Sequence, residues 1–394
     1  MKKAIISIAL ACISGLTASA QINGDGYYRV QNATTKRYMS LTDNTSRGID
    51  VSSTTVEAMA LLTKKNWEEV STDPGTVFYI TKANSDEYNI KAQGSSLYDM
   101  IKYYIRLRYY QNGNVYRAWQ SKSGATIYLS DENQFTIGDD IGFVDNNVMS
   151  AVNWSITKVD TENNYLGVKP TVTANGKHYA TFYASFPFSV TSDKMKVYYI
   201  SSVNENKGNA IFKELTGIIP ASTPVIIECE STDPAQNKLK IEENSGTTAI
   251  KDNLMTGVYF SIGSRLTAHY NSVEFKPESM RVLGVAEDGS LTFNDADTYM
   301  EDVLIRVGNY PSYTYPSIKA IPHNTGYLKV SANCPKELKV MDEATGIKDL
   351  TTDTDNKPAA IYSISGVKVR EKATSVEGLP QGIYIFKNKK YIVK

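Results

Sequence analysis

The sequence predicts an all-β, multidomain chain, and three observations support this. A length of 394 residues exceeds one typical domain of ~100–200 residues, so two or three domains are expected. Tyrosine, which favours strands as Val, Ile and Thr do, is unusually frequent, with 27 copies. Short stretches of alternating apolar and polar residues recur between turn-forming residues, a pattern typical of β-hairpins. We expect a β-trefoil-like or hairpin-barrel N-terminal domain, a β-sandwich middle region and a small C-terminal β module.

Charge and motif content argue against several classes of protein. Lys and Arg number 42 and so do Asp and Glu, whereas binding to nucleic-acid phosphates needs a basic surplus. The chain lacks a Gly-x-Ser-x-Gly elbow, His-Glu-x-x-His, a phosphate-binding loop and Cys-x-x-Cys. With 3 His and 3 Cys, we expect no metal site, no cofactor and no catalytic residue. A pair of carboxylates from distant strands would escape this search.

Residues 1–20 are predicted to be a secretory signal peptide. Lys2 and Lys3 precede an apolar stretch that is shorter than the ~20 residues a membrane-spanning helix needs. Small residues end the segment, so we expect cleavage between Ala20 and Gln21. The alternative, lipid attachment at Cys12, has its leucine two residues upstream instead of three. The mature chain is therefore expected to be secreted or attached to the outer surface, with no transmembrane segment.

Two cysteines, Cys229 and Cys334, remain in the mature chain. Export to an oxidising compartment permits a disulfide between them, which would add ~4–5 kcal/mol in the chain-entropy model. The alternative is two buried free thiols, because Cys229 continues an apolar run over residues 225–227.

Residues 21–170 are predicted to form a domain of four repeated hairpins. Each copy starts with an aromatic residue, any residue and an aliphatic residue, and a second tyrosine follows 10 to 12 residues later, after a polar turn. The copies begin at Tyr28, Phe78, Tyr116 and Trp154. The first interval is the longest and contains a capping box, Thr54-x-x-Glu57, before helix-forming residues. We expect a short helix over residues 56–62.

Two segments of this domain carry a family resemblance. They are Gly26-Tyr27-Tyr28-Arg29-Val30-Gln31-Asn32, followed by Lys36-Arg37-Tyr38-Met39-Ser40-Leu41, and Trp154-Ser155-Ile156. The first resembles the opening of a ricin-type β-trefoil lectin repeat, and the second resembles the Trp-x-aliphatic strand of that family. The resemblance spans about residues 26–170 and implies a carbohydrate-binding role. The Gln-x-Trp signature of the family is absent.

The stretch Ile101–Tyr110 supplies the candidate binding surface. Odd positions are apolar and even positions are basic or aromatic, which predicts a strand with one buried and one open face. Aromatic rings stack on sugar rings, and arginine donates forked hydrogen bonds to hydroxyls or carboxylates. The candidate ligand-binding residues are Tyr104, Arg106, Arg108, Tyr110 and Trp119. The alternative is a solvated face with ordinary cross-strand Tyr–Arg pairs.

Residues 171–345 are predicted to form a β-sandwich-like region with an internal repeat. The pattern Ile-Pro-x-x-Thr, followed by a turn-forming residue and a strand, begins at Ile219 and again at Ile321, 102 residues later. Proline suits a position just before a strand, where no ladder donor is needed. Two related β units, or one sandwich with pseudo-symmetry, would both give this repeat.

Residues 346–359 are predicted to be a linker, and residues 360–394 a separate β module. The linker sequence Thr351–Pro358 has no apolar residue to bury. The module contains Ile361-Tyr362-Ser363-Ile364-Ser365-Gly366, then Leu379-Pro380-Gln381-Gly382-Ile383-Tyr384, and a lysine-rich end at Lys394. This resembles the C-terminal sorting domain of proteins handled by the type IX secretion system, which implies secretion machinery as a partner. Gly366 and Gly382 are expected in tight turns. The alternative is an ordinary terminal β module.

These features together predict a secreted or cell-surface binding protein without enzymatic activity, for a glycan or a host or matrix partner. Two alternatives remain: a structural or adhesive surface component without a small ligand, and an unrecognised hydrolase.

Overall fold

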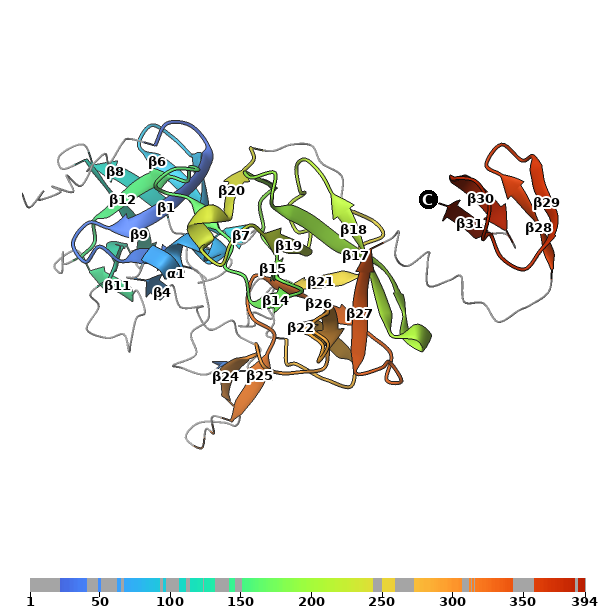
Figure 1. Ribbon diagram of the computed structural model, residues 1–394. Coiled ribbons are helices and arrows are strands. Elements are labelled where there is room, and N and C mark those ends of the chain that lie inside the picture. Colours follow the sequence, from blue (N-terminus) through green and yellow to red (C-terminus); the bar gives the residue numbers. More distant parts are fainter. Residues whose placement is uncertain are drawn as a thin grey trace, which may run out of the picture. The chain divides into compact units, whose positions relative to one another are not determined.

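The chain is all-β, as predicted (Figure 1). The computed structural model describes residues 22–40, 49–50, 62–64, 67–92, 95–96, 106–110, 114–122, 124–131, 142–145, 151–243, 250–258, 273–306, 312, 314, 316–342, 358–386 and 389–393. The chain divides into two compact units, one of Met1–Leu41 with Ala60–Asn164 and one of Thr42–Met59 with Tyr165–Lys394.

Helix is confined to short segments of the described chain. These are α1 (Trp67–Ser71), η1 (Pro74–Thr76), η2 (Glu205–Lys207) and η3 (Pro234–Gln236). Most of the helix expected over residues 56–62 lies outside the described residues. Its last residue, Leu62, begins a strand, and α1 starts five residues later.

Six strands of the first unit close into a barrel. They are β1 (Gly26–Asn32), β5 (Phe78–Lys82), β6 (Glu87–Ala92), β8 (Arg106–Tyr110), β9 (Val115–Lys122) and β12 (Trp154–Lys158). Every neighbouring pair is antiparallel, and β12 closes the ring because it pairs with both β1 and β9. Closure leaves no free strand edge in the barrel.

The aromatic-x-aliphatic repeat explains why these strands form a barrel. Its aromatic and aliphatic positions are two residues apart, so both face the same side of a strand. All of them are buried, on strands β1, β5, β9 and β12. The buried residues are Tyr28, Val30, Phe78, Ile80, Tyr116, Ala118, Trp154 and Ile156.

Short strands extend the barrel strands at three places. They are β2 (Tyr38–Ser40) and β4 (Leu62–Lys64) beside β1, β7 (Ser95–Ser96) beside β6, and β10 (Ala125–Ser130) and β11 (Gly142–Asp145) beside β9. The first three predicted repeats are hairpins, but the fourth, beginning at Trp154, is not. Both edges of β12 are already paired with β1 and β9, so no edge is left for a return strand.

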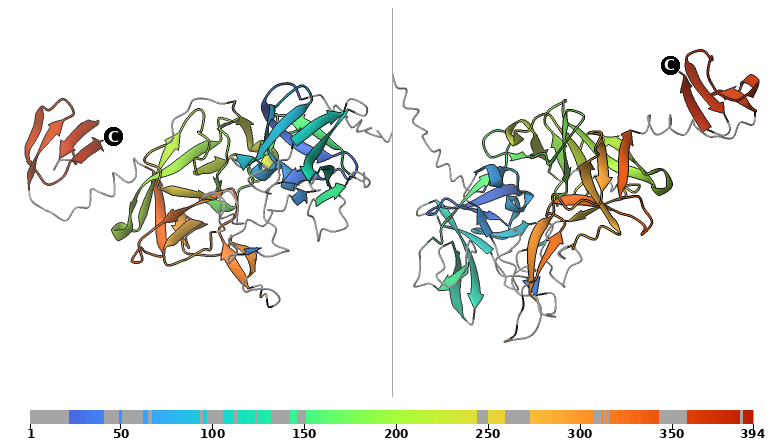
Figure 2. Two further views of the ribbon diagram at one scale, coloured as in Figure 1. Left: turned by 180° about the vertical axis from the view of Figure 1, so that it is seen from behind. Right: turned by 60° about the horizontal axis from the view of Figure 1, so that its bottom comes forward.

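The middle region is built on a ten-stranded sheet. In sheet order its strands are β14 (Val172–Ala174), β15 (Lys177–Phe182), β19 (Val225–Cys229), β17 (Lys196–Asn204), β18 (Asn209–Leu215), β27 (Glu337–Asp342), β23 (Leu291–Asn294), β22 (Met280–Val285), β26 (Thr325–Lys329) and β21 (Met255–Val258). The sheet curls, so that β14 contacts β22 and β15 contacts β26. Figure 2 shows its first half in green and its second half in yellow to orange.

The internal repeat corresponds to the two halves of this sheet. The order β15-β19-β17-β18 is mirrored by β21-β26-β22-β23, with β27 between the halves. Strands β19 and β26 come from the two Ile-Pro motifs, and the residue before the threonine of each motif, Ser222 or Asn324, has a positive φ, 59° and 55° respectively. One curled sheet with pseudo-symmetry therefore accounts for the repeat. The halves meet at equivalent positions, since a Cβ on Gly326 would lie 3.2 Å from Cβ of Pro224.

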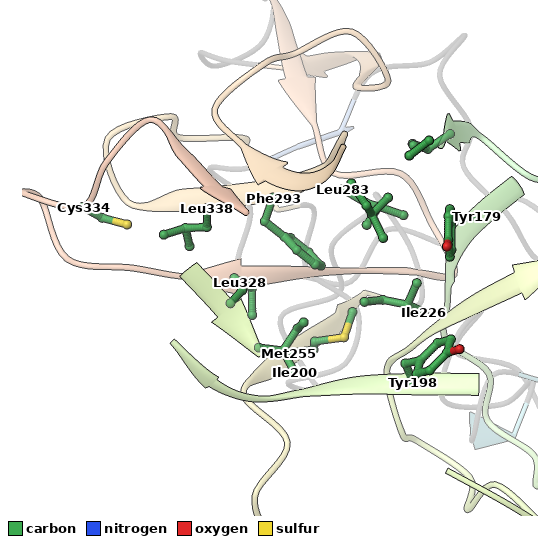
Figure 3. Packing of buried hydrophobic residues seen from close by; sticks show 14 residues of the cluster. Tyr179, Tyr198, Ile200, Ile226, Met255, Leu283, Phe293, Leu328, Cys334 and Leu338 are labelled. Carbon is green, nitrogen blue, oxygen red and sulfur yellow. The ribbon is translucent and has the colours of Figure 1, made fainter. Parts of the chain in front are cut away.

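A single core fills the concave side of the sheet (Figure 3). Side chains from both halves converge there, among them Ile226 from β19, Leu283 from β22 and Phe293 from β23. The two halves of one curled sheet therefore pack against each other through this core, as the two sheets of a sandwich do.

Smaller sheets complete the second unit. One consists of β13 (Leu166–Gly167), β20 (Lys238–Ile241) and β16 (Phe188–Val190), and another of β25 (Ser317–Ala320), β24 (Glu301–Arg306) and β3 (Ile49–Asp50). The ring of Phe188 lies 5.1 Å from that of Phe182 on β15, so the first small sheet packs on the large one.

Cys229 and Cys334 are both buried free thiols, so the disulfide considered above is not formed. Successive residues of a strand face opposite sides of its sheet. Ile226 faces the core that contains Cys334, whereas Cys229, three residues further along β19, faces the other side. Its sulfur lies 3.9 Å from the carbonyl oxygen of Ile227.

The C-terminal residues form a sheet with its own core. Its strands lie in the order β29 (Lys368–Ala373), β28 (Ala359–Ser363), β30 (Gly382–Phe386) and β31 (Lys389–Val393), and all pairs are antiparallel. Residues 346–357 of the predicted linker, and Lys394, lie outside the described residues. Gly366 has a φ of +80° in the β28–β29 turn, as expected. Gly382 instead opens β30, where a Cβ would lie 3.3 Å from the hydroxyl of Tyr384.

Candidate functional site

Strand β8 places three of the five predicted ligand-binding residues on the outside of the barrel. Arg106, Arg108 and Tyr110 alternate with Leu107, which is buried inside. Trp119 on β9 lies directly opposite Arg106. Tyr104 lies outside the described residues. The period-two pattern therefore assigned the faces of β8 correctly over its described length.

A carboxylate that the sequence search missed holds two of these arginines. Glu87 on β6 lies opposite Arg108. One of its oxygens accepts a hydrogen bond of 3.0 Å from Arg106, and the other accepts two from Arg108, at 2.5 and 3.2 Å. Asn84 donates to the same carboxylate at 2.9 Å. Charge-assisted forked bonds of this kind are about twice as strong as neutral ones.

The environment keeps Glu87 ionised. Its side chain is only 8% exposed, and burial by itself would raise its pKa. Hydrogen bonds from Arg108, Asn84 and Arg106 outweigh that effect and lower the pKa below its ordinary value. The negative charge is therefore held in place beneath two guanidinium groups.

Aromatic rings cover the neighbouring cations. The guanidinium of Arg108 lies 4.3 Å from the ring centroid of Trp119. The guanidinium of Arg117, on β9, lies 4.4 Å from the ring of Tyr110 and 5.7 Å from that of Tyr128 on β10. Each such contact contributes ~0.5–2 kcal/mol, depending on exposure.

Two further contacts fix this arrangement. The Nε of Arg117 donates to Asn153 at 2.9 Å, just before β12. The hydroxyls of Tyr110 and Tyr128 lie 3.4 Å apart. Burial, and then the hydrogen bond with Tyr110, raises the pKa of the Tyr128 hydroxyl above its ordinary value. We call Glu87, Arg106, Arg108, Tyr110, Arg117, Trp119 and Tyr128 the cation–aromatic face.

Chemically, this face offers aromatic rings and guanidinium groups held in one geometry. Cross-strand pairing of rings and cations, the alternative stated above, is present. The side chains of Arg106 and Arg108 nevertheless keep 33% and 34% of their surface exposed. The Nε1 atom of Trp119 is buried and makes no hydrogen bond within the described part of the chain.

Sequence patterns explain which residues of the face were found. Arg106, Arg108 and Tyr110 share one strand, so alternation along that strand reveals them together. Glu87 and Tyr128 come from other strands, and their place depends on cross-strand register. For Glu87 the sequence does hold one signal. It directly precedes Tyr88, which faces the barrel interior, and side chains alternate along a strand, so Glu87 must face outward.

Neither a metal-binding cluster nor a membrane-spanning helix is present among the described residues. No group of three or more His, Cys, Asp or Glu in them is arranged to hold a metal ion. None of the helices in the same residues has the length and apolar character needed to cross a membrane.

Comparisons with known proteins give little further information. No family model matches the chain, and no curated protein matches it. Among solved structures, that of a mosquitocidal holotoxin is similar, with 13% sequence identity and a TM-score of 0.21. The similarity covers 78% of this chain but 34% of that one, so this chain spans about a third of the toxin chain's length. Likeness at this level carries no argument about function.

Proposed function

We propose that the protein is a secreted or cell-surface binding protein without enzymatic activity, and that its barrel binds glycans through the cation–aromatic face. The observation that carries this proposal is the set of three partly exposed arginines held by Glu87 or by aromatic rings. Rings stack on the apolar faces of sugars, and guanidinium groups donate to hydroxyls and carboxylates. Side chains fixed before binding lose little conformational entropy when a ligand arrives. The resemblance to ricin-type lectin repeats supports the same role.

A glycan array with the purified mature protein tests the proposal. Arg106→Gln removes a partly exposed guanidinium but leaves the Glu87–Arg108 pair intact, and Tyr110→Phe keeps the ring over Arg117 while removing a hydroxyl. We expect the double variant to lose roughly tenfold or more in affinity for the glycans that the wild type binds. Lys91→Gln is the matched control, because Lys91 is an exposed cation on strand β6 of the same barrel.

The alternatives give different results in the same experiment. A folded protein that binds no glycan supports a structural or adhesive component, in which the cation–aromatic face only stabilises the barrel. An activity screen on polysaccharides and peptides addresses the third candidate, a hydrolase with a carboxylate pair from distant strands. A host or matrix protein partner would bind in a pull-down that the double variant abolishes.

We further propose that the C-terminal module directs export or surface attachment, after the signal peptide is cleaved between Ala20 and Gln21. The supporting observation is its separate core, which consists of Ile361, Ala373, Tyr384, Phe386 and Tyr391. Deleting residues 360–394 is expected to leave the rest folded and to strand the protein in the periplasm. Normal levels of the truncated protein in the medium or on the cell surface would contradict this role.

A further inference from the structure

The C-terminal sheet has apolar residues on both of its faces. Its inner face is covered by the module's own segment between β29 and β30, through Val376 and Leu379. Its outer face keeps large apolar side chains exposed. On this face the exposed large apolar side chains are Tyr362 (37%), Ile385 (37%) and Ile392 (53%). Val369 (42%) on β29 and Ile364 (60%) and Val367 (64%) in the β28–β29 turn are exposed beside them. A sheet face of this kind requires a second layer, because contiguous exposed apolar surface marks an interaction site.

Cross-strand pairing arranges the outer face in rows. Tyr362 on β28 lies opposite Ile385 on β30, and Lys368 and Lys390 flank this pair on β29 and β31. One row therefore crosses all four strands with an apolar centre and a lysine at each edge. Lys368 makes an exposed ion pair with Glu371 at 3.5 Å. A second pair, Ile383 and Ile392, continues the apolar centre.

We propose that this outer face is the surface by which the C-terminal module docks on a folded protein of the export machinery, and that the partner offers an apolar face bordered by carboxylates. The inference rests on the proposed export role of the module. Residues 359–394 carry seven Lys or Arg and two Glu. That surplus, with lysines at both edges of the apolar row, is complementary to an acidic rim and opposes packing against a second copy of the same face.

The shape of the surface favours a protein over a lipid bilayer as the occupant. Regular rows of side chains on a four-stranded sheet interdigitate with a facing layer of side chains about 10 Å away, as in β-sandwiches. The module is then half of a sandwich, and its partner supplies the second half.

The test measures export of the full chain in its native host, as the ratio of protein in the medium and on the cell surface to protein in the periplasm. Ile385→Thr with Ile392→Thr keeps β-branched side chains in the strands but removes apolar surface. We expect it to lower the exported ratio roughly tenfold, which corresponds to about 1.4 kcal/mol of lost binding. Lys368→Glu with Lys390→Glu is expected to do the same without touching the module's core. Val285→Thr, an exposed valine on β22, is the matched control and should export normally.

Each outcome decides a different point. If deletion of residues 360–394 does not block export, the export role and the docking surface are both wrong. If the deletion blocks export but both double variants are exported normally, the module is recognised elsewhere and this inference alone is overturned. Binding of the wild type, but not of the Ile385→Thr/Ile392→Thr variant, to phosphatidylglycerol vesicles would make the occupant a lipid surface. A dimer in size-exclusion chromatography that the same variant abolishes would make it a second copy.

Discussion

The barrel and the C-terminal module both carry arginine or lysine among aromatic and aliphatic side chains on an outward sheet face. The two faces differ in what contacts these cations. On the barrel, Glu87 and the rings of Tyr110, Trp119 and Tyr128 contact the arginines directly. On the module, Lys368 and Lys390 border a row of partly exposed apolar side chains, Tyr362 and Ile385. The cations of the barrel face are therefore paired with residues of the barrel itself, whereas the module face leaves large apolar side chains exposed.

We expect the largest difference in stability between a substitution on the inner face of the module and one on its outer face. Phe386 is 4% exposed on the inner face, and Phe386→Ala should cost about 3–5 kcal/mol, more than a single small sheet can lose. Ile392 is 53% exposed on the outer face, and Ile392→Ala should stay within about 0.5 kcal/mol. Limited proteolysis of the full chain with mass spectrometry reports cleavage inside residues 359–393. Equally fast cleavage of the two variants would show that the faces do not differ.

The second effect tests the ion pairs of the barrel face. Glu87→Ala leaves two guanidinium groups without their shared carboxylate, and a loss of about 1–3 kcal/mol is expected, because both arginines are partly exposed and screened. The neighbouring Asp86 is 55% exposed and 3.9 Å from Arg108, so Asp86→Ala should change stability by less than about 0.5 kcal/mol.

Urea unfolding followed by tryptophan fluorescence measures this difference selectively. All 3 tryptophans, Trp67, Trp119 and Trp154, belong to the first unit, so the signal reports the barrel. If Asp86→Ala lowers the free energy of unfolding as much as Glu87→Ala does, general surface charge and not the buried carboxylate stabilises this face.

The third prediction concerns pH. Hydrogen bonds lower the pKa of Glu87 in the folded barrel, so its charged form stabilises the fold. That stability is fully present above the ordinary glutamate pKa of about 4.3 and is lost as the pH falls through the lower pKa of the folded state. The urea midpoint of the wild type should therefore fall further on acidification from neutral pH than that of Glu87→Gln. Parallel pH profiles would show that Glu87 contributes no pH-dependent stability.

The smallest effect concerns Trp119. Its buried Nε1 has no acceptor in the described structure, so Trp119→Phe removes an unsatisfied donor while keeping a ring over Arg108. The free energy of unfolding should change by no more than about 1 kcal/mol. Trp119→Leu removes the ring and should be the less stable of the two variants in urea unfolding monitored by far-ultraviolet circular dichroism. Equal stability of both variants would mean that stacking on Arg108 contributes nothing.

Much of the fold could be predicted because strands reveal themselves locally. The aromatic-x-aliphatic repeat identified four of the six barrel strands, and alternation over Ile101–Tyr110 identified a fifth, β8. The two Ile-Pro motifs located β19 and β26 at equivalent places in the middle region. In each case neighbouring residues alone carry the signal, since side chains two apart share a face.

The sequence by itself determined the strand content, the faces of β8, the duplicated middle region and the β character of the C-terminal residues. Only the tertiary structure decided that β12 closes the barrel as a single strand, that Glu87 holds Arg106 and Arg108, and that Cys229 and Cys334 face different sides of one sheet. The physical reason is that alternation along a strand is local, whereas register between strands is set by pairs of residues far apart in the chain. The interactions that complete each face, whether with another strand or with a partner, follow from that register.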